Sequence, residues 1–500
     1  MMFSALVWIT FTVLATVPLL NAFVRKNKHK KLPPGPRALP IIGHLHLLGK
    51  NPHQDLHNLS KNYGPVMHLK FGFTTNIVVS SPRGAELFLK TNDLVFASRP
   101  PLVSAKYMLY EQRDLSFSKY GSYWRNIRKL CTSQLLSTMK VNSFESMRSR
   151  EVGLLIKSLK KAEKSVVNLS AEVASLSANM SCLMVFGKKY SDEEFCERGF
   201  KDVIREVMRL LVAPHLGDYF PFLESALHLD PQGLTRRMKE VSKIFDKFLN
   251  TIIDEHQKLD NPSNTFVSTL LALNRAGDID FEFDTTHIKG VLLDMLAASM
   301  DTSATSVEWL LSELFRQPRV MKKVQEELEQ IIGLNRMVDE SDLDKLKYLD
   351  MVVKESFRLH PPVPLLLPHA AMEDCTVEGY HIPKESRILV NAWSIGRDPN
   401  TWKDPEKFIP ERFDGSNNTN IDVWGQNFEL IPFGSGRRGC PGMQLGFIVV
   451  RLVVGQLMHC FDWELPKGML PEEVDMVEEF GLVMSREKPL MAIPTYRLRL

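Results

Sequence analysis

The sequence lacks the patterns that mark a zinc ribbon, a disulfide framework or a nucleotide-binding domain. Its six cysteines are scattered over 500 residues and include no CxxC pair, so neither a zinc ribbon nor a disulfide scaffold is expected. No GxGxxG follows a predicted strand, which argues against a flavin or nicotinamide domain. Internal repeats and low-complexity tracts are missing, and hydrophobic and charged shares of 44% and 24% indicate a folded globular chain.

Charge is absent from the first 24 residues. The stretch Met1–Val24 contains no charged side chain, and its length suits a helix that crosses the hydrocarbon core of a bilayer. Five positive residues follow at once, namely Arg25, Lys26, Lys28, Lys30 and Lys31. A cleaved secretory signal is the alternative, but there the basic cluster would precede the apolar run. We therefore expect residues 1–24 to be a retained, single-pass transmembrane anchor, with the rest of the chain in the cytosol.

Negative charge is in slight excess after this cluster. Because the whole chain carries +3 and its first 31 residues carry +5, the remainder carries a formal net charge of −2. A body with this balance has no broad basic surface for a polyanion, so nucleic acid is not an expected partner.

Residues 25–43 are predicted to link the anchor to the body. They are basic at first, and KLPPGPRALPIIG then holds four prolines, which resist helix formation and favour a stiff, extended hinge. Beyond the hinge, VMHLKFGFTTNIVVSS places apolar and polar residues alternately before a turn, which predicts a β-hairpin.

Most of the remaining chain has helical periodicity. Apolar residues recur at intervals of three and four over residues 147–160, 241–257, 288–315 and 320–332. The stretch TVEGYHIPKESRILV instead has the pattern of short strands around turns. Residues 44–500 are therefore predicted to form a mainly helical body with small β-sheets.

One cysteine occupies an unusual place, in the stretch FGSGRRGCPG. Four glycines allow tight turns around Cys440, and Pro441 can begin the helix that MQLGFIVVRLVVGQLM predicts. A thiolate is favoured by backbone N–H groups, nearby positive charge and a helix N-terminus, all of which this setting offers. A buried cysteine in a glycine-rich turn is the simpler alternative, but the surrounding pattern favours a metal ligand.

These residues resemble the haem-binding loop of the cytochrome P-450 monooxygenases. Phe433-x-x-Gly436-x-Arg438-x-Cys440-x-Gly442 fills every fixed position of that loop, and the similarity extends over essentially the whole chain. The resemblance implies the cytochrome P-450 fold for residues 44–500 and a haem b cofactor. It makes Cys440 the proximal thiolate of the iron and pairs Arg438 with a haem propionate. The anchor and the PPGP hinge are similar to those of plant A-type members, which lie in the endoplasmic reticulum membrane.

Further stretches match the family in the same chain order. KESFRLHPP places Glu355 and Arg358 on one face of a predicted helix, where they can form an ion pair. An isolated ExxR is more often a solvated surface pair. Since PERF lies between it and the cysteine loop, the resemblance implies that Arg412 joins both residues in a buried structural network beneath the haem.

Two more stretches are expected to contact the haem. YWRNIRK places Trp124 and Arg128 one helical turn apart, a spacing that a core tryptophan beside a surface arginine would also show. By resemblance, both residues contact haem propionates. His369, in LLLPHA, falls where family members carry an arginine or histidine for the same purpose.

The oxygen side of the site is expected on the long helix around residues 288–315. A haem-thiolate that splits dioxygen needs protons, and neighbouring acid and hydroxyl groups in an apolar helix can deliver them. Asp301 and Thr302 supply that pair. The family pattern is Ala or Gly, Gly, any residue, Asp or Glu, Thr, whereas Ser299 takes the place of the usual glycine here. The shape of the helix at Ser299 is left open.

The substrate pocket is less defined by the sequence. Asp294, Ala298 and Thr302 are spaced by four and are expected to share the helix face toward the haem. Other expected pocket residues are Val363, Leu365 and Leu366 in PVPLLLPH. By resemblance, the segment 100–118 and the region 480–484, which includes Met484, also reach the substrate.

Together these features predict a haem-thiolate monooxygenase that hydroxylates a hydrophobic small molecule with dioxygen. Because the chain has no electron-transfer domain of its own, a separate donor is implied, which by resemblance is NADPH-cytochrome reductase, with cytochrome b5 as a further candidate. The plant A-type group favours aromatic substrates of specialised metabolism, such as phenolics, flavonoids or biphenyls, over terpenoids. Two alternatives stay open: a haem-thiolate isomerase or dehydratase that acts without dioxygen, and a non-catalytic haem-binding protein.

Overall fold

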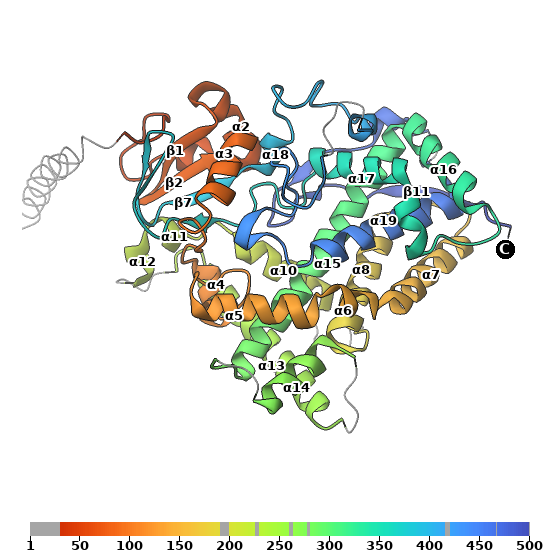
Figure 1. The fold of residues 1–500 in the computed structure, drawn as a ribbon, viewed down its shortest axis with the longest axis horizontal. Helices are drawn as coiled ribbons and strands as arrows, with labels where there is room; N and C mark the ends of the chain where they lie inside the picture. Colours follow the sequence, from red (N-terminus) through yellow and green to blue (C-terminus); the bar gives the residue numbers. More distant parts are fainter. Residues whose placement is uncertain are drawn as a thin grey trace, which may run out of the picture.

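The structure is a computed structural model of the chain, and it describes residues 31–190, 200–225, 230–259, 264–277, 281–415, 421–466 and 468–499. The predicted transmembrane anchor, residues 1–24, and the start of the predicted hinge lie outside these residues. Helices make up most of the described molecule, and its strands form four small sheets (Figure 1). The prediction of a mainly helical body with small sheets is confirmed.

The largest sheet gathers strands from both halves of the sequence. Its order is β1 (Val66–Phe71), β2 (Thr74–Val79), β7 (Arg387–Val390) and β4 (His369–Ala370). β1 and β2 are antiparallel, with Phe71 opposite Thr74, which is the predicted hairpin. β2 runs parallel to β7, and β4 runs antiparallel to it. On β1 the side chains of Met67, Leu69 and Phe71 are buried, as the alternating pattern requires.

Three smaller sheets complete the strands of the described chain. They join β3 (Val167–Asn168), β11 (Met491–Tyr496) and β8 (Phe461–Glu464); β5 (Cys375–Val377) and β6 (Tyr380–Ile382); and β9 (Glu478–Glu479) and β10 (Ser485–Arg486). The sequence predicted short strands around turns in the region that holds β5, β6 and β7.

The helices that build most of the body fall into two groups along the chain. The first comprises α2 (Pro52–Tyr63), α3 (Pro82–Glu86), α4 (Val103–Met108), α5 (Ser122–Leu130), α6 (Thr138–Asn142), α7 (Glu145–Lys161), α8 (Leu169–Phe186), α10 (Phe200–Val212), α11 (Leu216–Tyr219) and α12 (Pro221–Ser225). The second comprises α13 (Leu234–Gln257), α14 (Phe266–Ala276), α15 (Thr285–Arg316), α16 (Pro318–Ile332), α17 (Lys347–Leu359), α18 (Ala392–Ile395) and α19 (Met443–Cys460). All four stretches with helical periodicity lie in helices, namely α7, α13, α15 and α16.

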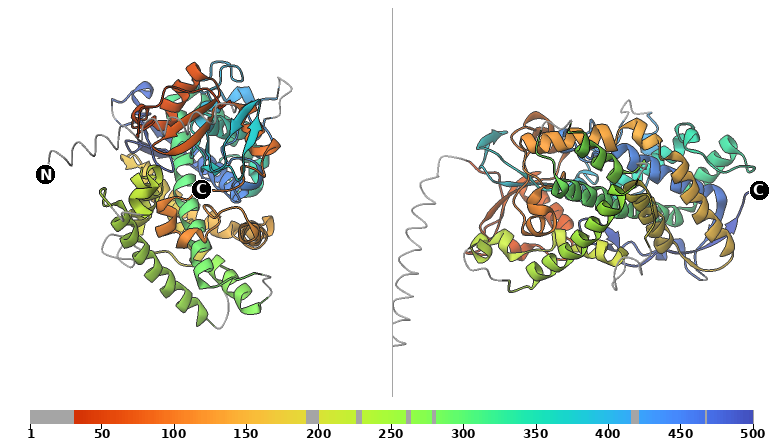
Figure 2. Two further views of the ribbon diagram at one scale, coloured as in Figure 1. Left: turned by 90° about the vertical axis from the view of Figure 1, so that its left-hand side faces the viewer. Right: turned by 90° about the horizontal axis from the view of Figure 1, so that it is seen from below.

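The helix α15 passes through the centre of the molecule (Figures 1 and 2). It is 32 residues long and begins at a capping box in which the Asp284 side chain accepts from the His287 amide. It packs against α8, α14, α16, α17 and α19, so most of its residues are buried. Its hydrogen bonding is continuous through Ser299, whose hydroxyl donates to the Met295 carbonyl at 2.7 Å and bonds the Ser181 hydroxyl on α8 at 2.7 Å. The shape of the helix at this position, which the sequence left open, is therefore regular.

Two described helices are as long and apolar as a membrane span. α8 and α19 each have 18 residues and mean hydropathies of 1.3 and 1.5. Since 61% and 72% of their residues are buried inside the protein, length and composition alone do not make either helix a span.

The described part of the predicted hinge is bonded to the body. The Lys31 carbonyl accepts from the His381 amide at 2.7 Å, and the Pro34 carbonyl accepts from the His68 amide of β1 at 2.9 Å. Gly43 forms a bridge to Phe71 at the end of the same strand. Residues 31–43 are thus attached along β1 instead of spanning free solvent.

A buried charge network joins α17 to the chain that precedes the cysteine loop. Arg358 Nε and Nη2 donate to the two oxygens of Glu355 at 2.7 and 2.8 Å, and both side chains are fully buried. Arg412, in the short helix Pro410–Phe413, donates to Glu355 Oε1 at 3.0 Å. The remaining Arg358 donors reach the carbonyls of Gly396, Pro405 and Lys407. Every charge in this cluster has a partner, which is the condition for burying it.

The network predicts a strong effect on stability for Glu355→Ala. Without the carboxylate, Arg358 stays buried and unpaired, so we expect a loss of about 3–5 kcal/mol in the free energy of unfolding. Denaturant unfolding followed by circular dichroism measures it, with Lys347→Ala, an exposed position at the start of the same helix, as the control. An unchanged unfolding midpoint for Glu355→Ala would show that the network does not stabilise the fold.

Candidate active site

The cysteine loop folds back on itself before α19 begins. The Cys440 amide donates to the Phe433 carbonyl at 2.8 Å, and the Gly439 amide donates to the Gly436 carbonyl at 3.0 Å. Gly436 has a φ of +69°, and a Cβ there would lie 2.1 Å from the Leu89 carbonyl oxygen. A side chain at this position is therefore excluded both by backbone conformation and by space. Gly436 shapes the loop without lining the cavity described next.

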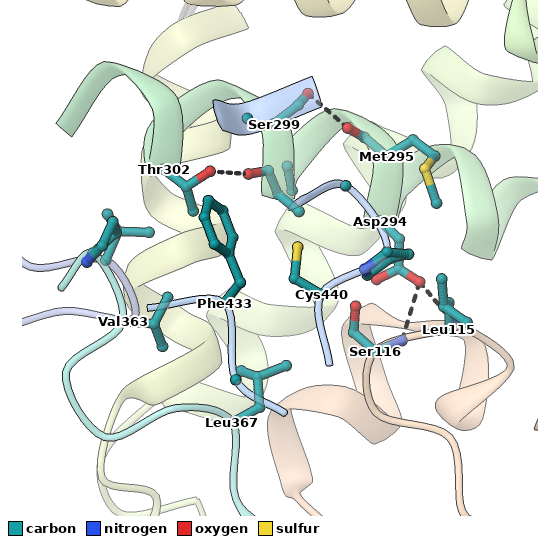
Figure 3. A pocket seen from close by; sticks show the side chains of 18 of the residues that line it. Leu115, Ser116, Asp294, Met295, Ser299, Thr302, Val363, Leu367, Phe433 and Cys440 are labelled. Carbon is teal, nitrogen blue, oxygen red and sulfur yellow. Dashed lines mark hydrogen bonds between the residues drawn. The ribbon is translucent and has the colours of Figure 1, made fainter. Parts of the chain in front are cut away.

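A cavity of about 300 Å³ lies between Cys440 and α15. The Cys440 sulfur points into it, and Phe433 and Gly442 line it beside the cysteine (Figure 3). Burial raises the pKa of the Cys440 thiol, whereas the Gly442 amide and the positive charge of Arg128 lower it. Within the described residues, no three His, Cys, Asp or Glu side chains come together as a metal site. A metal at Cys440 would therefore need ligands from a cofactor.

The α15 face of the cavity carries the residues spaced by four. Asp294, Ala298 and Thr302 all line it, as that spacing predicts. The Thr302 hydroxyl donates to the Ala298 carbonyl at 2.6 Å (Figure 3). Asp301 is not among the lining residues. Burial raises the pKa of its carboxyl group, and Arg205 on α10 acts in the opposite direction. The acid and the alcohol are thus adjacent in sequence but face different surroundings.

Positive side chains gather at one end of the cavity. Arg438, Arg128 and Arg99 all line it, together with Trp124 and His369. The Arg438 guanidinium lies 4.0 Å from the centre of the Trp124 ring. Arg128 donates to the Gly439 carbonyl at 2.6 Å, and His369 Nδ1 bonds the Phe96 carbonyl at 2.8 Å.

These cations lack counter-ions. In the described part of the chain, no carboxylate lies within ion-pair distance of Arg99, Arg128 or Arg438. Burial and mutual repulsion lower the pKa of Arg438 to about 8, and burial above all lowers that of Arg99 to about 9. The pKa of His369 is lowered well below its usual value by burial, and Arg99 lowers it further. A flat, apolar group with acidic substituents would fill the cavity and offset this charge, and haem with its two propionates is such a group.

The apolar walls match the predicted substrate residues only in part. Val363 and Leu366 line the cavity, whereas Leu365 packs with the apolar cluster beneath β1. Met484 is fully buried behind the wall, where its amide donates to Pro362 and its carbonyl accepts from Trp309. Leu365 and Met484 therefore do not contact the cavity.

Several lining residues were not found from the sequence. Arg99, in FASRP, lines the cavity but belongs to no motif with a recognisable spacing, whereas Leu115–Phe117 lie in the segment 100–118 that the resemblance placed near the substrate. Leu367 and Val483 take the places expected of Leu365 and Met484. The one available sequence signal was an arginine in a stretch with few other polar residues, FASRP, which could have suggested that Arg99 is buried.

Comparisons with known proteins agree with this geometry. The family model described as Cytochrome P450 matches residues 33–493. Cytochrome P450 CYP736A12 of Panax ginseng is 50% identical over 483 residues, which covers 94% of this chain and 95% of that protein. Flavonoid 3'-monooxygenase of Arabidopsis thaliana is 42% identical over 496 residues, covering 97% and 96%.

A solved structure shares the fold. A zebra fish cytochrome P450 determined with abiraterone superposes with a TM-score of 0.74 at 26% identity, covering 89% of this chain and all of that one. The family match spans nearly the whole chain, and the fold, the cysteine loop and the cation-lined cavity accord with it. The protein thus belongs to the cytochrome P-450 family and is a haem-thiolate oxidoreductase of the monooxygenase type.

Proposed function

We propose that this protein hydroxylates an apolar aromatic small molecule of plant specialised metabolism, with electrons from NADPH-cytochrome reductase. The observation that carries the proposal is the enclosed cavity that brings the Cys440 sulfur opposite the Thr302 hydroxyl within largely apolar walls. Relatives named flavonoid 3'-monooxygenase, from Arabidopsis thaliana and Petunia hybrida at 42% and 41% identity, support an aromatic substrate. The reaction places one oxygen atom of dioxygen in the substrate and releases the other as water, which consumes two electrons and two protons.

The residues at the cation-lined end would hold the haem. Cys440 would bind the iron through its sulfur, and Arg438, Arg128 and Arg99 would offset the charge of the propionates. An anion beside His369 would favour its protonated form. When bound, the haem supplies an iron centre that activates dioxygen, and its thiolate ligand favours cleavage of the O–O bond.

The α15 residues would manage the protons. The Thr302 hydroxyl faces the cavity, where it can hold a water molecule and pass on a proton. Since burial raises the pKa of Asp301, this carboxyl group holds its proton more readily than an exposed one and can exchange it away from the cavity. Together they would move protons inward without opening the apolar site to bulk water.

The apolar walls of the cavity would select an apolar substrate. Its walls come from α8, α10 and the loop before α5, and they include Met180, Met184, Met208, Leu211 and Phe117. Methionine side chains adapt to flat ring systems and make favourable contacts with aromatic rings. Burial of the substrate's apolar surface would supply most of its affinity, at about 25 cal/mol per Å².

An exposed apolar surface supports a place on the endoplasmic reticulum membrane, with the catalytic body in the cytosol. Ile41 and Phe73 are 70% and 55% exposed, and Phe222 is 47% exposed. The rings of Phe73 and Phe222 lie 6.0 Å apart, and the Gly72 amide bonds the Ile42 carbonyl, so the three segments adjoin. Large exposed apolar side chains that cluster in this way suit contact with lipid. The membrane-bound donors NADPH-cytochrome reductase and cytochrome b5 would meet the protein there.

Reconstitution with the reductase tests the proposed activity. We expect NADPH-dependent products heavier by one oxygen atom from a panel of flavonoids, simple phenolics and biphenyl, measured by mass spectrometry, with terpenoids oxidised less well. Products that are isomers or dehydration products formed without dioxygen would indicate a rearranging enzyme. Haem binding with no turnover of any compound would indicate a non-catalytic haem protein.

Replacing Cys440 tests the haem ligand. We expect the reduced, carbon monoxide-bound spectrum of the wild-type protein to show the thiolate band, and Cys440→Ala to lose it with all activity, because no other cysteine of the described residues lines the cavity. Cys375→Ala is the matched control, since this free thiol lies on β5, away from the cavity. A thiolate band that persists in Cys440→Ala would refute the assignment.

Thr302→Ala tests the proton route. A positioned proton donor is worth about 10²–10⁴-fold in rate, so we expect NADPH to be consumed largely as hydrogen peroxide, with product per NADPH reduced by about tenfold or more. Haem content should not change. Thr305→Ala is the control, because Thr305 is buried on the same helix but does not line the cavity. Equal coupling in the two variants would remove the role of Thr302.

A further inference from the structure

The segment Asp114–Ser118, called here the pocket loop, forms the wall of the cavity beside α5. Its backbone amides donate to two carboxyl groups. Asp294 Oδ2 on α15 accepts from the amides of Leu115 at 2.6 Å and Ser116 at 3.3 Å (Figure 3). Asp114 Oδ2 accepts from the Phe117 amide at 3.0 Å. The Asp294 oxygen that faces the loop is thus engaged by backbone and is not free for a substrate.

The carbonyls of the pocket loop accept from the positive end of the cavity. Trp124 Nε1 donates to the Leu115 carbonyl at 3.0 Å, and Arg99 Nε donates to the Ser116 carbonyl at 2.9 Å. Arg438 Nη2 donates to the Ser118 carbonyl at 2.6 Å. Carboxyl groups therefore hold one side of the loop and cations hold the other, so the loop connects α15 to the residues that would bind the propionates.

The chain enters the pocket loop under constraint. Tyr110, Glu111 and Gln112 have φ values of +48°, +59° and +64°, a left-handed turn that is costly for residues with a side chain. The next residue, Arg113, lies so close to α15 that a Cβ on Gly290 would approach its carbonyl oxygen to 2.4 Å. A strained entry persists only where the surrounding contacts fix it, and the bonds to Asp294 follow directly after it.

Burial raises the pKa of both carboxyl groups, those of Asp114 and Asp294. Asp114 is fully buried, its Oδ1 has no hydrogen-bond partner, and burial and the neighbouring Asp294 raise its pKa well above the usual value. Burial raises the pKa of Asp294 to about 6, whereas its bonds to Ser116 and Leu115 act in the opposite direction. Other groups that interact with this pair are Arg438, Arg99, Tyr123 and Cys131.

We propose that Asp294 is a positioning residue, whose carboxylate fixes the pocket loop as the wall against which the substrate is oriented. The proposal rests on the monooxygenase function proposed for the same cavity. It assigns Asp294 an indirect role in substrate selection: the side chains of Leu115, Ser116 and Phe117 meet the substrate, and Asp294 determines where they stand. Asp114 supports the loop from within, through its bond from the Phe117 amide.

The test compares Asp294→Ala, Asp294→Asn and Asp114→Asn in the haem-loaded, full-length protein. Amide hydrogen exchange over residues 115–117 reports the anchoring of the loop, and the ratio of hydroxylation products reports its effect on substrate orientation. Glu340→Gln is the matched control, because it removes the charge of another largely buried ion pair, with Arg148, outside the cavity. The carbon monoxide-bound spectrum verifies that each variant retains haem.

We expect Asp294→Ala to speed exchange at Leu115 and Ser116 by about tenfold or more, since hydrogen bonds to a charged acceptor are lost. Its product ratio should change, with a larger effect on KM than on kcat. Asp294→Asn keeps an acceptor oxygen and should recover part of both properties. Asp114→Asn should resemble the wild type, because the amide oxygen can accept from the Phe117 amide in place of the carboxyl oxygen. Glu340→Gln should lower stability and leave loop exchange and product ratio unchanged.

Three results would overturn the proposal. The first is unchanged exchange in Asp294→Ala, and the second is faster exchange with an unchanged product ratio. The third is a selective loss of cationic or hydrogen-bond-donating substrates with unchanged exchange, which would make Asp294 a direct contact. If the wild type oxidises no compound in the panel, the proposed function fails by itself. The affinity of a neutral aromatic ligand, read from the shift of the haem absorption band, then replaces the product ratio, and an affinity unchanged in Asp294→Ala overturns the proposal.

Discussion

Uncompensated positive charge inside the protein is the constraint on which the active site depends. Arg438, Arg128 and Arg99 donate hydrogen bonds to carbonyl oxygens in a largely apolar interior, and Arg438 also lies over the Trp124 ring, but no carboxylate of the described chain is in ion-pair range. Carbonyls orient a guanidinium but do not neutralise it. The folded protein therefore has a site for an anion built into its core, next to the cysteine that is proposed to bind the iron. The cofactor completes the electrostatics of the fold as well as its chemistry.

The central helix gives this arrangement its geometry. α15 carries Thr302 opposite the cysteine and Asp294 against the pocket loop, and it packs on α19, which begins just after Cys440. One helix therefore positions both the Thr302 hydroxyl and the carboxylate that holds the pocket loop. Ser299 also fixes α15 against α8, because its hydroxyl bonds both its own helix and Ser181 of α8. The Glu355 network joins α17 to residues 396–412, the part of the chain that precedes the cysteine loop.

Patterns local in sequence predicted most of the fold, and contacts distant in sequence account for what was missed. Helical spacing correctly placed Asp294, Ala298 and Thr302 on one face, yet Asp294 bonds a loop that lies 179 residues earlier. No spacing rule could reveal that partner. Leu365 turns away from the cavity just before Leu366, whose φ of +48° redirects the chain, a feature that an apolar run does not signal. The cysteine loop could be recognised from the sequence because its glycines and arginines lie within ten residues.

The attachment of residues 31–43 fixes where the described chain begins on the surface of the body. A flexible connecting segment would leave the position of Lys31 relative to the body undefined. Here the backbone leaves the body from a clamped point at Lys31, and the exposed rings of Phe73 and Phe222 adjoin the same strand and turn. The start of the described chain therefore holds a fixed position relative to the exposed rings of Phe73 and Phe222.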